Sequence, residues 1–488
     1  MNFSLADFPH DPASFLASLH SMHGDIASLE THGRQVVFVF SPELNQTVLS
    51  QPDLFHSMFF PVRGPRRSAQ RRVTSGLLSI NGPAHRQARR VLKPVFNRTT
   101  IMRYLAPVAE MTDAFLADWQ VGDTRDVAKE MTTLALRITS SILFGLDDLR
   151  PALRLGRIIE EWVDLNHRSG ISAFLAEDDS HDIYAQLLKQ AERIEEELID
   201  LIASRRSENK ARHDVLSILA GRNAAAELSD EQLIGHTALL FAAAHLTTAH
   251  SLTWTLLLLA QHPHVVQRLR STDEQVDLNK AANVAENTCL WDRVIKESMR
   301  ILPASAYSQR VVQEETTLGD IRCQPGNAVI WSQFITHRRS DVYDQPSRFN
   351  PDRWLDINPS AYEYLPFGAG PRMCLGGPLA LAEMKVILPK IVERFSLEAV
   401  EEEEISGKII STMLSPATPV PLQLLDPTCY GRTVPLQGNI SQLVQFDRMS
   451  DSRRPHILSP KASQRQTGRQ SQFNVAEMPE VPRETSIR

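Results

Sequence analysis

The sequence lacks several patterns that would mark particular classes of protein. Only 4 of its 488 residues are cysteines and none forms a C-x-x-C pair, so neither a zinc site nor a disulfide framework is indicated. It has no run of about 20 apolar residues that could span a membrane. The N-terminus lacks the cationic start and apolar core of a signal peptide. We therefore expect a soluble cytoplasmic protein in a reducing compartment, without a membrane span.

The net charge is also modest, and the amino-acid composition shifts near the C-terminus. The formal net charge is -6, which is ordinary for a soluble protein and does not suit one that coats nucleic acid, so no nucleic-acid partner is predicted. From about Pro427 the composition shifts to Ser, Gln, Arg and Pro with few large apolar residues, which cannot bury enough surface to fold alone. We predict a folded domain over residues 1–426 and a disordered or loosely docked extension over 427–488.

Helical periodicity dominates the predicted domain. Amphipathic patterns cover residues 11–30 and, with short breaks, 99–219. Residues 34–40, 308–312 and 328–331 have strand character instead. The predicted fold class is therefore mainly α, with a small β-subdomain beside the helices.

A long buried helix is predicted in the second half of the chain. A capping box at Ser229 begins it and His262-Pro263 ends it, with apolar character nearly all round between them. Its middle has the sequence F-A-A-A-H-L-T-T-A-H. Ala243 and Ala244 are small enough for a flat cofactor to lie against the helix, and Thr247 can donate a hydrogen bond to an oxygen species on it.

The most informative stretch is L-P-F-G-A-G-P-R-M-C-L-G-G-P-L-A-L-A-E, residues 365–383. Glycines on both sides of Cys374 would let a large flat ligand approach the backbone closely. A helix that starts near Pro378 points its positive end at Cys374 and favours the thiolate, and Arg372 adds a cation. These features suit an axial thiolate on a haem iron. The alternative, a small buried apolar residue in a turn, is the commoner fate of an isolated cysteine.

The pattern F-G-x-G-x-R-x-C-x-G closely resembles the haem-binding loop of the cytochrome P450 family, the haem-thiolate monooxygenases. The resemblance implies a cytochrome P450-like helical domain that binds haem b, with Cys374 as the proximal iron ligand. It also implies that Phe367 packs beside the sulfur and that Arg372 binds a haem propionate. Gly370 and Gly376 would be cofactor-binding glycines of this loop.

Further cofactor contacts follow from the same resemblance. His85 and Arg89 are four residues apart, on one helix face, and match a His and an Arg that the family directs at the haem propionates. Arg310 matches the position of another propionate-binding arginine. Ala243 and Ala244 match the small residues of the oxygen-activating helix.

A charged brace is predicted from the order of two motifs. Glu297 and Arg300 form an E-x-x-R pair, and P-S-R-F-N-P-D-R-W follows later with Arg353. The three residues resemble the family's Glu–Arg–Arg brace, which fixes the cysteine loop from behind. His337 matches a position where the family often has a histidine, more often structural than catalytic.

The oxygen-activating motif departs from the family at one position. The family segment A-G-x-[D/E]-T-T makes Thr247 the alcohol of a proton relay, but Leu246 occupies the place of the usual acid. Leucine cannot carry a proton. Three interpretations stay open. His245 or a water chain could replace the acid, the enzyme could use peroxide or rearrange a substrate that already holds an O–O bond, or it could be a weakly coupled oxygenase.

The expected activity is insertion of one oxygen atom from O2 into a small hydrophobic molecule of specialised-metabolite or lipid metabolism. Electrons would come from separate ferredoxin or reductase proteins, since no flavin or ferredoxin region is visible in the sequence. We expect the donor protein to dock on a basic face that consists of Arg86, Arg90, Lys93 and Arg98. The protein is expected to be a monomer. The alternatives are a haem-thiolate peroxygenase, isomerase or dehydratase, and a non-catalytic haem-binding sensor.

Overall fold

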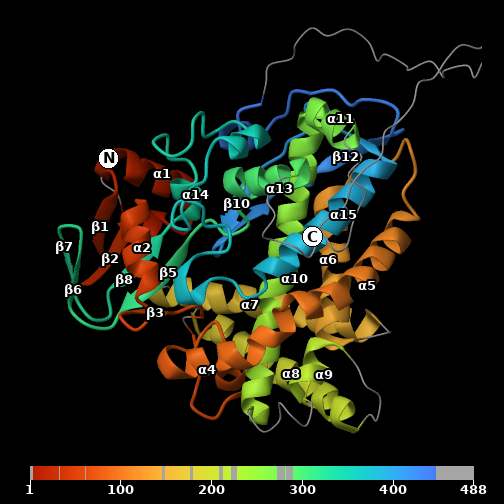
Figure 1. The fold of residues 1–488 in the computed structure, drawn as a ribbon. Coiled ribbons are helices and arrows are strands. Elements are labelled where there is room, and N and C mark those ends of the chain that lie inside the picture. The colour runs from red at the N-terminus through yellow and green to blue at the C-terminus, as the bar shows by residue number, and fades with distance from the viewer. Residues whose placement is uncertain are drawn as a thin grey trace, which may run out of the picture.

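The structure is a computed structural model that describes most of the chain. The described residues are 4–31, 33–60, 62–145, 149–175, 180–207, 213–220, 228–271, 281 and 289–446. Helices make up the larger part of them, and the largest sheet lies to one side, on the left in Figure 1. The prediction of a mainly α fold with a small β part is confirmed.

The elements of the described residues are as follows. The α-helices are α1 (Pro12–His23), α2 (Pro42–Ser50), α3 (Ala69–Val73), α4 (Gly82–Leu92), α5 (Arg98–Leu116), α6 (Val127–Phe144), α7 (Leu149–Leu175), α8 (Ser180–Ser207), α9 (Val215–Ala220), α10 (Asp230–Gln261), α11 (Pro263–Ser271), α13 (Leu290–Ile301), α14 (Gln333–Thr336), α15 (Gly377–Arg394) and α16 (Ile440–Leu443). Short 3-10 helices are η1 (Leu5–Asp7), η2 (Lys93–Phe96), η3 (Pro351–Leu355) and η4 (Gly370–Arg372). The strands are β1 (Ile26–Thr31), β2 (Arg34–Val39), β3 (Phe55–Ser57), β4 (Thr124–Asp126), β5 (Ser308–Val312), β6 (Thr316–Leu318), β7 (Ile321–Cys323), β8 (Ala328–Trp331), β9 (Ser396–Ala399), β10 (Gly407–Ile410), β11 (Met413–Pro416) and β12 (Pro421–Leu425).

The helix α10 runs through the middle of the helical part (Figure 1). It begins with the predicted capping box, in which the Ser229 hydroxyl accepts from the Gln232 N–H and the Gln232 side chain accepts from the Ser229 N–H. Because α10 is apolar nearly all round, it packs among α6, α7, α13 and α15. None of the described helices, α10 included, is long and apolar enough to cross a membrane.

The largest sheet positions β5, which contains Arg310. Its strand order is β1-β2-β8-β5-β3, with β2 parallel to β8 and the other neighbours antiparallel. In this register Ser57 of β3 is paired with Arg310 of β5. The sheet thus brings the segment before α4 close to a predicted cofactor contact.

The helix predicted over residues 11–30 is shorter than expected. It ends at His23, because Gly24 takes a positive φ of 73° and its N–H caps the His20 carbonyl. Residues 26–31 form β1 instead, with Ile26 opposite Val39 of β2. Pairing with a buried neighbouring strand overrides the local helical pattern.

The segment that follows Leu425 packs against the domain in its first part. Val434, Ile440 and Val444 are buried in the main core, and the Gln445 N–H donates to the Ser347 carbonyl at 2.7 Å. Residues 427–446 of the expected disordered or loosely docked extension are thus in contact with the domain through these apolar side chains. Residues 447–488 of the expected extension lie outside the described residues.

Candidate functional site

Cys374 lies in a tight loop between η4 and the start of α15. Its backbone N–H donates to the Phe367 carbonyl at 2.8 Å, which closes the loop. Gly370 has a φ of 70°, and a Cβ atom there would lie 2.3 Å from the Leu49 carbonyl oxygen, so a larger residue does not fit. The Phe367 ring lies 3.2 Å from the Cβ position of Gly377. The loop is thus shaped by glycines that the sequence pattern contains.

Cys374 is exposed as a residue, and yet its thiol is surrounded by protein atoms. The residue is exposed, but burial among surrounding atoms raises the pKa of its thiol. The N–H groups of Gly376 and Gly377 and the charge of Arg89 act in the opposite direction on this pKa. The sulfur therefore lies in a recess, where the start of α15 favours the thiolate, as predicted, but burial has the larger effect.

Four predicted cofactor contacts gather into one basic group. They are His85 and Arg89 on α4, Arg310 on β5 and Arg372 in the cysteine loop. Burial, followed by the charges of the three arginines, lowers the pKa of His85 to about 4. Burial, followed by the charge of Arg372, lowers the pKa of Arg310 to about 10. Burial, followed by the charge of Arg89, lowers the pKa of Arg372 to about 10.

No acid neutralises this basic group within the part of the chain that the structure describes. The charges that act on the four residues come from one another, from Arg86 and from Cys374. In addition, the Nε atom of Arg372 is buried without a hydrogen-bond partner in the described residues. Partly buried cations without acidic partners form a site for an anionic ligand.

Asn81 holds Arg372 in the basic group, although the sequence analysis did not single it out. The Arg372 Nη2 atom donates to the Asn81 Oδ1 atom at 2.6 Å and also to the Ile80 carbonyl. Asn81 is itself fixed by β3, since it accepts from the Ser57 N–H at 2.8 Å and donates to the Ser57 carbonyl at 3.1 Å. An Asn directly before a helix predicts a cap, but the Asn81 side chain makes no cap hydrogen bond. Its contact with Arg372 has no local signal in the sequence.

The middle of α10 has two different sides. Ala243, Ala244 and Thr247 are partly exposed, and the Thr247 hydroxyl donates to the Ala243 carbonyl at 2.9 Å. His245 lies on the other side, because two residues along an α-helix rotate by about 200°. The structure thus brings together three of the predicted distal residues and separates His245 from Thr247.

His245 is engaged by α7. Its side chain is 1% exposed, and its Nε2 atom lies 2.7 Å from the Oε1 atom of Glu160. Its Nδ1 atom lies 3.3 Å from the Phe241 carbonyl oxygen. Both ring nitrogens of His245 thus contact groups other than Thr247.

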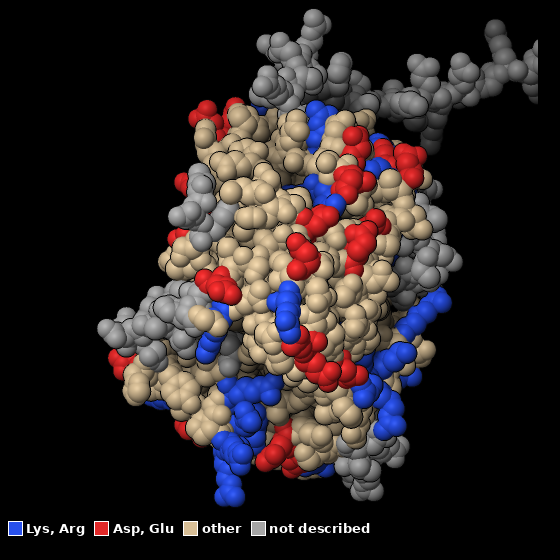
Figure 2. Space-filling view, turned by 90° about the vertical axis from the view of Figure 1, so that its left-hand side faces the viewer, with Lys and Arg blue, Asp and Glu red and all other residues tan. Residues whose placement is uncertain are grey.

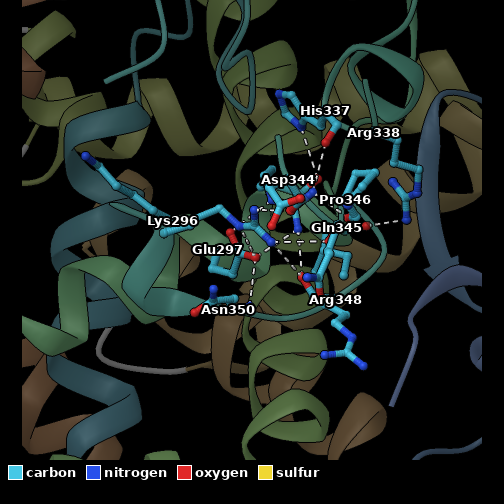
Figure 3. A network of polar contacts seen from close by, with 12 residues as sticks. Lys296, Glu297, His337, Arg338, Asp344, Gln345, Pro346, Arg348 and Asn350 are labelled. Carbon is cyan, nitrogen blue, oxygen red and sulfur yellow. Dashed lines mark hydrogen bonds and ion pairs between the residues drawn. The ribbon is translucent and has the colours of Figure 1, made fainter. Parts of the chain in front are cut away.

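Glu297, Arg300 and Arg353 meet in the interior, as the two motifs predict. Figure 3 shows Glu297 within the surrounding network of polar contacts. The Arg300 Nε and Nη2 atoms donate to the two Glu297 oxygens at 2.9 and 2.8 Å, and the Arg353 Nε atom donates to Oε1 at 2.9 Å. The Asn350 N–H and the Trp354 indole N–H complete the carboxylate shell at 2.9 and 3.0 Å. Glu297 and Arg300 are 0% exposed and Arg353 is 7% exposed, so the brace is buried.

The family model of cytochrome P450 matches residues 1–424. The chain belongs to the cytochrome P450 family. Two curated relatives from Streptomyces have names that state a reaction. Cyclooctat-9-en-7-ol 5-monooxygenase of Streptomyces melanosporofaciens is 28% identical, with 80% of this chain and 86% of the relative covered. Pentalenene oxygenase of Streptomyces avermitilis is 26% identical, with 83% and 91% covered.

Solved P450 structures have the same fold. Retinoic acid-bound CYP120A1 from a cyanobacterium superposes with a TM-score of 0.69 at 21% identity, covering 85% of this chain and 94% of its own. CYP175A1 from Thermus thermophilus superposes with a TM-score of 0.66 at 24% identity, covering 86% and 97%. These similarities establish the fold of this P450.

As a P450, the protein is a haem-thiolate oxidoreductase of the monooxygenase type, and its cofactor is iron protoporphyrin IX. The chemistry of its side chains fits that group. Cys374, an exposed residue, offers its sulfur for the iron. The basic group offers cations to the carboxylates of the porphyrin, and the alanines of α10 offer a flat apolar surface.

Proposed function

We propose that this P450 binds its haem through Cys374 and inserts one oxygen atom from O2 into a C–H or C=C bond of a small hydrophobic molecule. The observation that carries the proposal is the partly exposed side of α10, where Thr247 lies with Ala243, Ala244 and Leu246. This side offers a hydroxyl group within an otherwise apolar surface. The bound haem supplies dioxygen activation and oxygen transfer.

The side chains of the basic group would hold the cofactor by its carboxylates. Arg89, Arg310 and Arg372 can each donate charge-assisted hydrogen bonds to a carboxylate, and neutral His85 can donate one more. Burial, followed by the neighbouring positive charges, lowers the pKa values of His85, Arg310 and Arg372, and bound anions would relieve the repulsion among these charges. The Cys374 thiol loses its proton on metal binding, so its raised pKa is no obstacle to ligation.

A cyclic, largely hydrocarbon specialised metabolite is the substrate class we infer. The names of two relatives denote oxygenation of pentalenene and of the cyclic alcohol cyclooctat-9-en-7-ol. The side chains of Leu240, Ala243 and Leu246 give the partly exposed side of α10 a surface that suits such a molecule. The absence of charge among these residues argues against a strongly polar substrate.

Proton delivery must then proceed without the usual acid. Leu246 carries no proton, and His245 contacts Glu160 on the other side of α10. The Thr247 hydroxyl donates to the Ala243 carbonyl, which leaves its oxygen free to accept a hydrogen bond from water or an oxygen ligand. We therefore favour the water-chain interpretation, with Thr247 as its last protein group.

Leu246 also favours a second candidate function. A haem-thiolate enzyme that uses peroxide, or that isomerises or dehydrates a substrate, needs no acid beside Thr247. A non-catalytic haem-binding sensor would need neither the acid nor Thr247. Product formation distinguishes the sensor from both enzymes, and the oxidant distinguishes the two enzymes from each other.

We expect electrons to arrive from a separate acidic protein that docks beside the cysteine loop. The predicted docking face is exposed in all four of its residues, Arg86, Arg90, Lys93 and Arg98. Met373, next to the ligand cysteine, is 46% exposed and adds an apolar contact. Figure 2 shows basic side chains gathered in the lower part of one face of the molecule, the end at which α4 lies in Figure 1. Such a surface steers an acidic partner.

The experiment that tests the proposal has two stages. The reduced, carbon monoxide-bound protein is expected to give a thiolate-ligated haem spectrum, and Cys374→Ser is expected to abolish it. Oxygen consumption and product are then measured with a ferredoxin, a reductase and a panel of cyclic terpenes. Turnover with peroxide but none with dioxygen and the reductase would favour the second candidate, and haem binding without any product would favour the sensor.

A further inference from the structure

His337 is a buried histidine that connects two parts of the site. It follows α14 directly and is 0% exposed. Its Nδ1 atom lies 3.2 Å from the Arg300 carbonyl oxygen, and its Nε2 atom lies 2.7 Å from the Leu365 backbone nitrogen. Arg300 belongs to the brace on α13, and Leu365 is the first residue of the cysteine loop. One imidazole therefore spans the distance from the brace to the loop.

The two contacts determine the state of the ring. The backbone nitrogen of Leu365 is a donor, so Nε2 must accept, and Nδ1 must carry the proton donated to the Arg300 carbonyl. The neutral ring is favoured by its surroundings, because burial, followed by the charges of Arg300 and Arg338, lowers the pKa of His337 to about 3. Figure 3 shows the His337 ring at the edge of the brace network, next to Arg338.

The residue before Leu365 has a second connection to α13. The Tyr364 hydroxyl donates to the Lys296 carbonyl at 3.0 Å, and the Tyr364 ring centroid lies 5.5 Å from that of His337. On the loop side, the Gly368 N–H donates to the Leu365 carbonyl at 3.0 Å. The position of the turn that precedes Cys374 therefore depends on the position of Leu365.

We propose that His337 is a positioning residue that sets the cysteine loop against α13 and so fixes the Cys374 sulfur where it would bind the haem iron. The proposal rests on the proposed function in taking Cys374 as the haem ligand. Without the imidazole, the Leu365 N–H is buried without an acceptor and the start of the loop must move to find one. A moved loop would shift the sulfur and would weaken its bond to the haem iron.

Two conservative variants test the contact of His337 with Leu365 separately from its contact with Arg300. In His337→Gln the side-chain oxygen reaches the place of Nε2 and can still accept from Leu365. In His337→Asn the shorter side chain reaches only the place of Nδ1, so the contact with Leu365 is lost. We expect the Gln variant to keep the thiolate-ligated spectrum of the reduced, carbon monoxide-bound protein. The Asn variant is expected to convert largely to a neutral-thiol spectrum and to lose haem about tenfold faster.

His236→Ala is the matched control. His236 is also buried, and its Nδ1 atom accepts from the Leu77 N–H at 3.1 Å, but it serves the segment before α4 instead of the cysteine loop. Its loss is expected to lower stability without changing the ligation spectrum. A spectral change equal to that of His337→Asn would mean that general destabilisation explains both variants, and the proposal would be wrong.

Amide hydrogen exchange across residues 364–374 provides a measurement that does not need haem. Faster exchange in His337→Asn, but not in His337→Gln or His236→Ala, supports the proposal. Wild-type exchange and a wild-type spectrum in His337→Asn would overturn it. A wild-type protein that fails to bind haem through Cys374 would instead overturn the proposed function, and the exchange comparison would still decide the role of His337.

Discussion

Glu160 and His245 join α7 to α10 through a contact of 2.7 Å between Oε1 and Nε2. The Glu160 side chain is 34% exposed and the His245 side chain 1% exposed, so one end of the pair reaches solvent and the other is buried. Thr247 lies on the other side of α10. The pair is therefore a contact between two helices and does not lead toward the distal hydroxyl.

This geometry predicts different consequences for Thr247→Ala and Glu160→Gln. Removing the hydroxyl is expected to lower the rate of product formation on the order of 100-fold, because it removes the last protein group for proton delivery. Glu160→Gln retains a hydrogen-bond partner for His245 and is expected to leave the product formed per oxygen consumed unchanged. Simultaneous measurement of oxygen uptake and product checks both. An equal loss in the two variants would restore the pair as a proton route.

The brace is predicted to be essential for holding haem. Glu297→Ala or Arg300→Ala leaves a buried charge without its partner, which costs about 3–5 kcal/mol of unfolding free energy, and the protein is expected to purify without haem. The matched control is Arg86→Ala, because Arg86 and Asp53 form a pair whose side chains are 60% and 69% exposed. That change is expected to cost less than about 1 kcal/mol. Normal haem occupancy in the brace variants would show that the brace does not hold the loop.

The parts of the site that sequence could predict are those encoded by short motifs. The Cys374 loop is specified by glycines within a few residues of the sulfur. Glu297 and Arg300 are one helical turn apart, so their pairing is local, and Arg353 follows from a second motif. The ends of α10 are likewise local, since a capping box and a His-Pro step lie at its two termini.

The remaining contacts depend on elements that meet only in the folded chain. Asn81 binds Arg372 across 291 residues of sequence, and His245 finds Glu160 across 85. The strand β1 forms because β2 lies beside it, although its own sequence has a helical pattern. In the tail, Val434 and Ile440 are too few to offset the polar composition around them, so an average over the tail hides their burial.

Two buried histidines predict a loss of stability in acid. Burial lowers the pKa of His236 and of His250 from 6.5 to about 4. Between these values the unfolded chain binds protons that the folded chain does not, so stability is full above pH 6.5 and falls as the pH drops toward 4. At pH 5 each histidine is expected to lower the free energy of unfolding by about 2 kcal/mol relative to its value above pH 6.5.

The variant His236→Asn isolates one of the two contributions. Asn can still accept from the Leu77 N–H but does not titrate, so the difference in unfolding free energy between pH 7 and pH 5 is expected to shrink by about 2 kcal/mol. Urea unfolding of haem-loaded protein at the two pH values measures this difference. An unchanged difference would mean that His236 does not remain neutral in the folded protein.

Residues 427–446 are predicted to be part of the folded domain, although the family match ends at residue 424. A chain ending at residue 426 loses the buried side chains of Val434, Ile440 and Val444, each of which contributes about 1.5–3 kcal/mol by burial. It also loses the Leu443 carbonyl that accepts from Arg338 at 3.1 Å. We expect this chain to unfold at a lower temperature and to retain less haem than its matched control.

The matched control is a chain ending at residue 446, which keeps every described contact of the segment. It is expected to unfold like the full-length protein, whereas the shorter chain is expected to be clearly less stable. Calorimetry and the ratio of haem to protein absorbance measure the two effects. Equal unfolding temperatures and equal haem content in both truncated chains would place the boundary of the folded domain near residue 426. Burial of Val434, Ile440 and Val444 would then contribute nothing measurable to the stability of the domain.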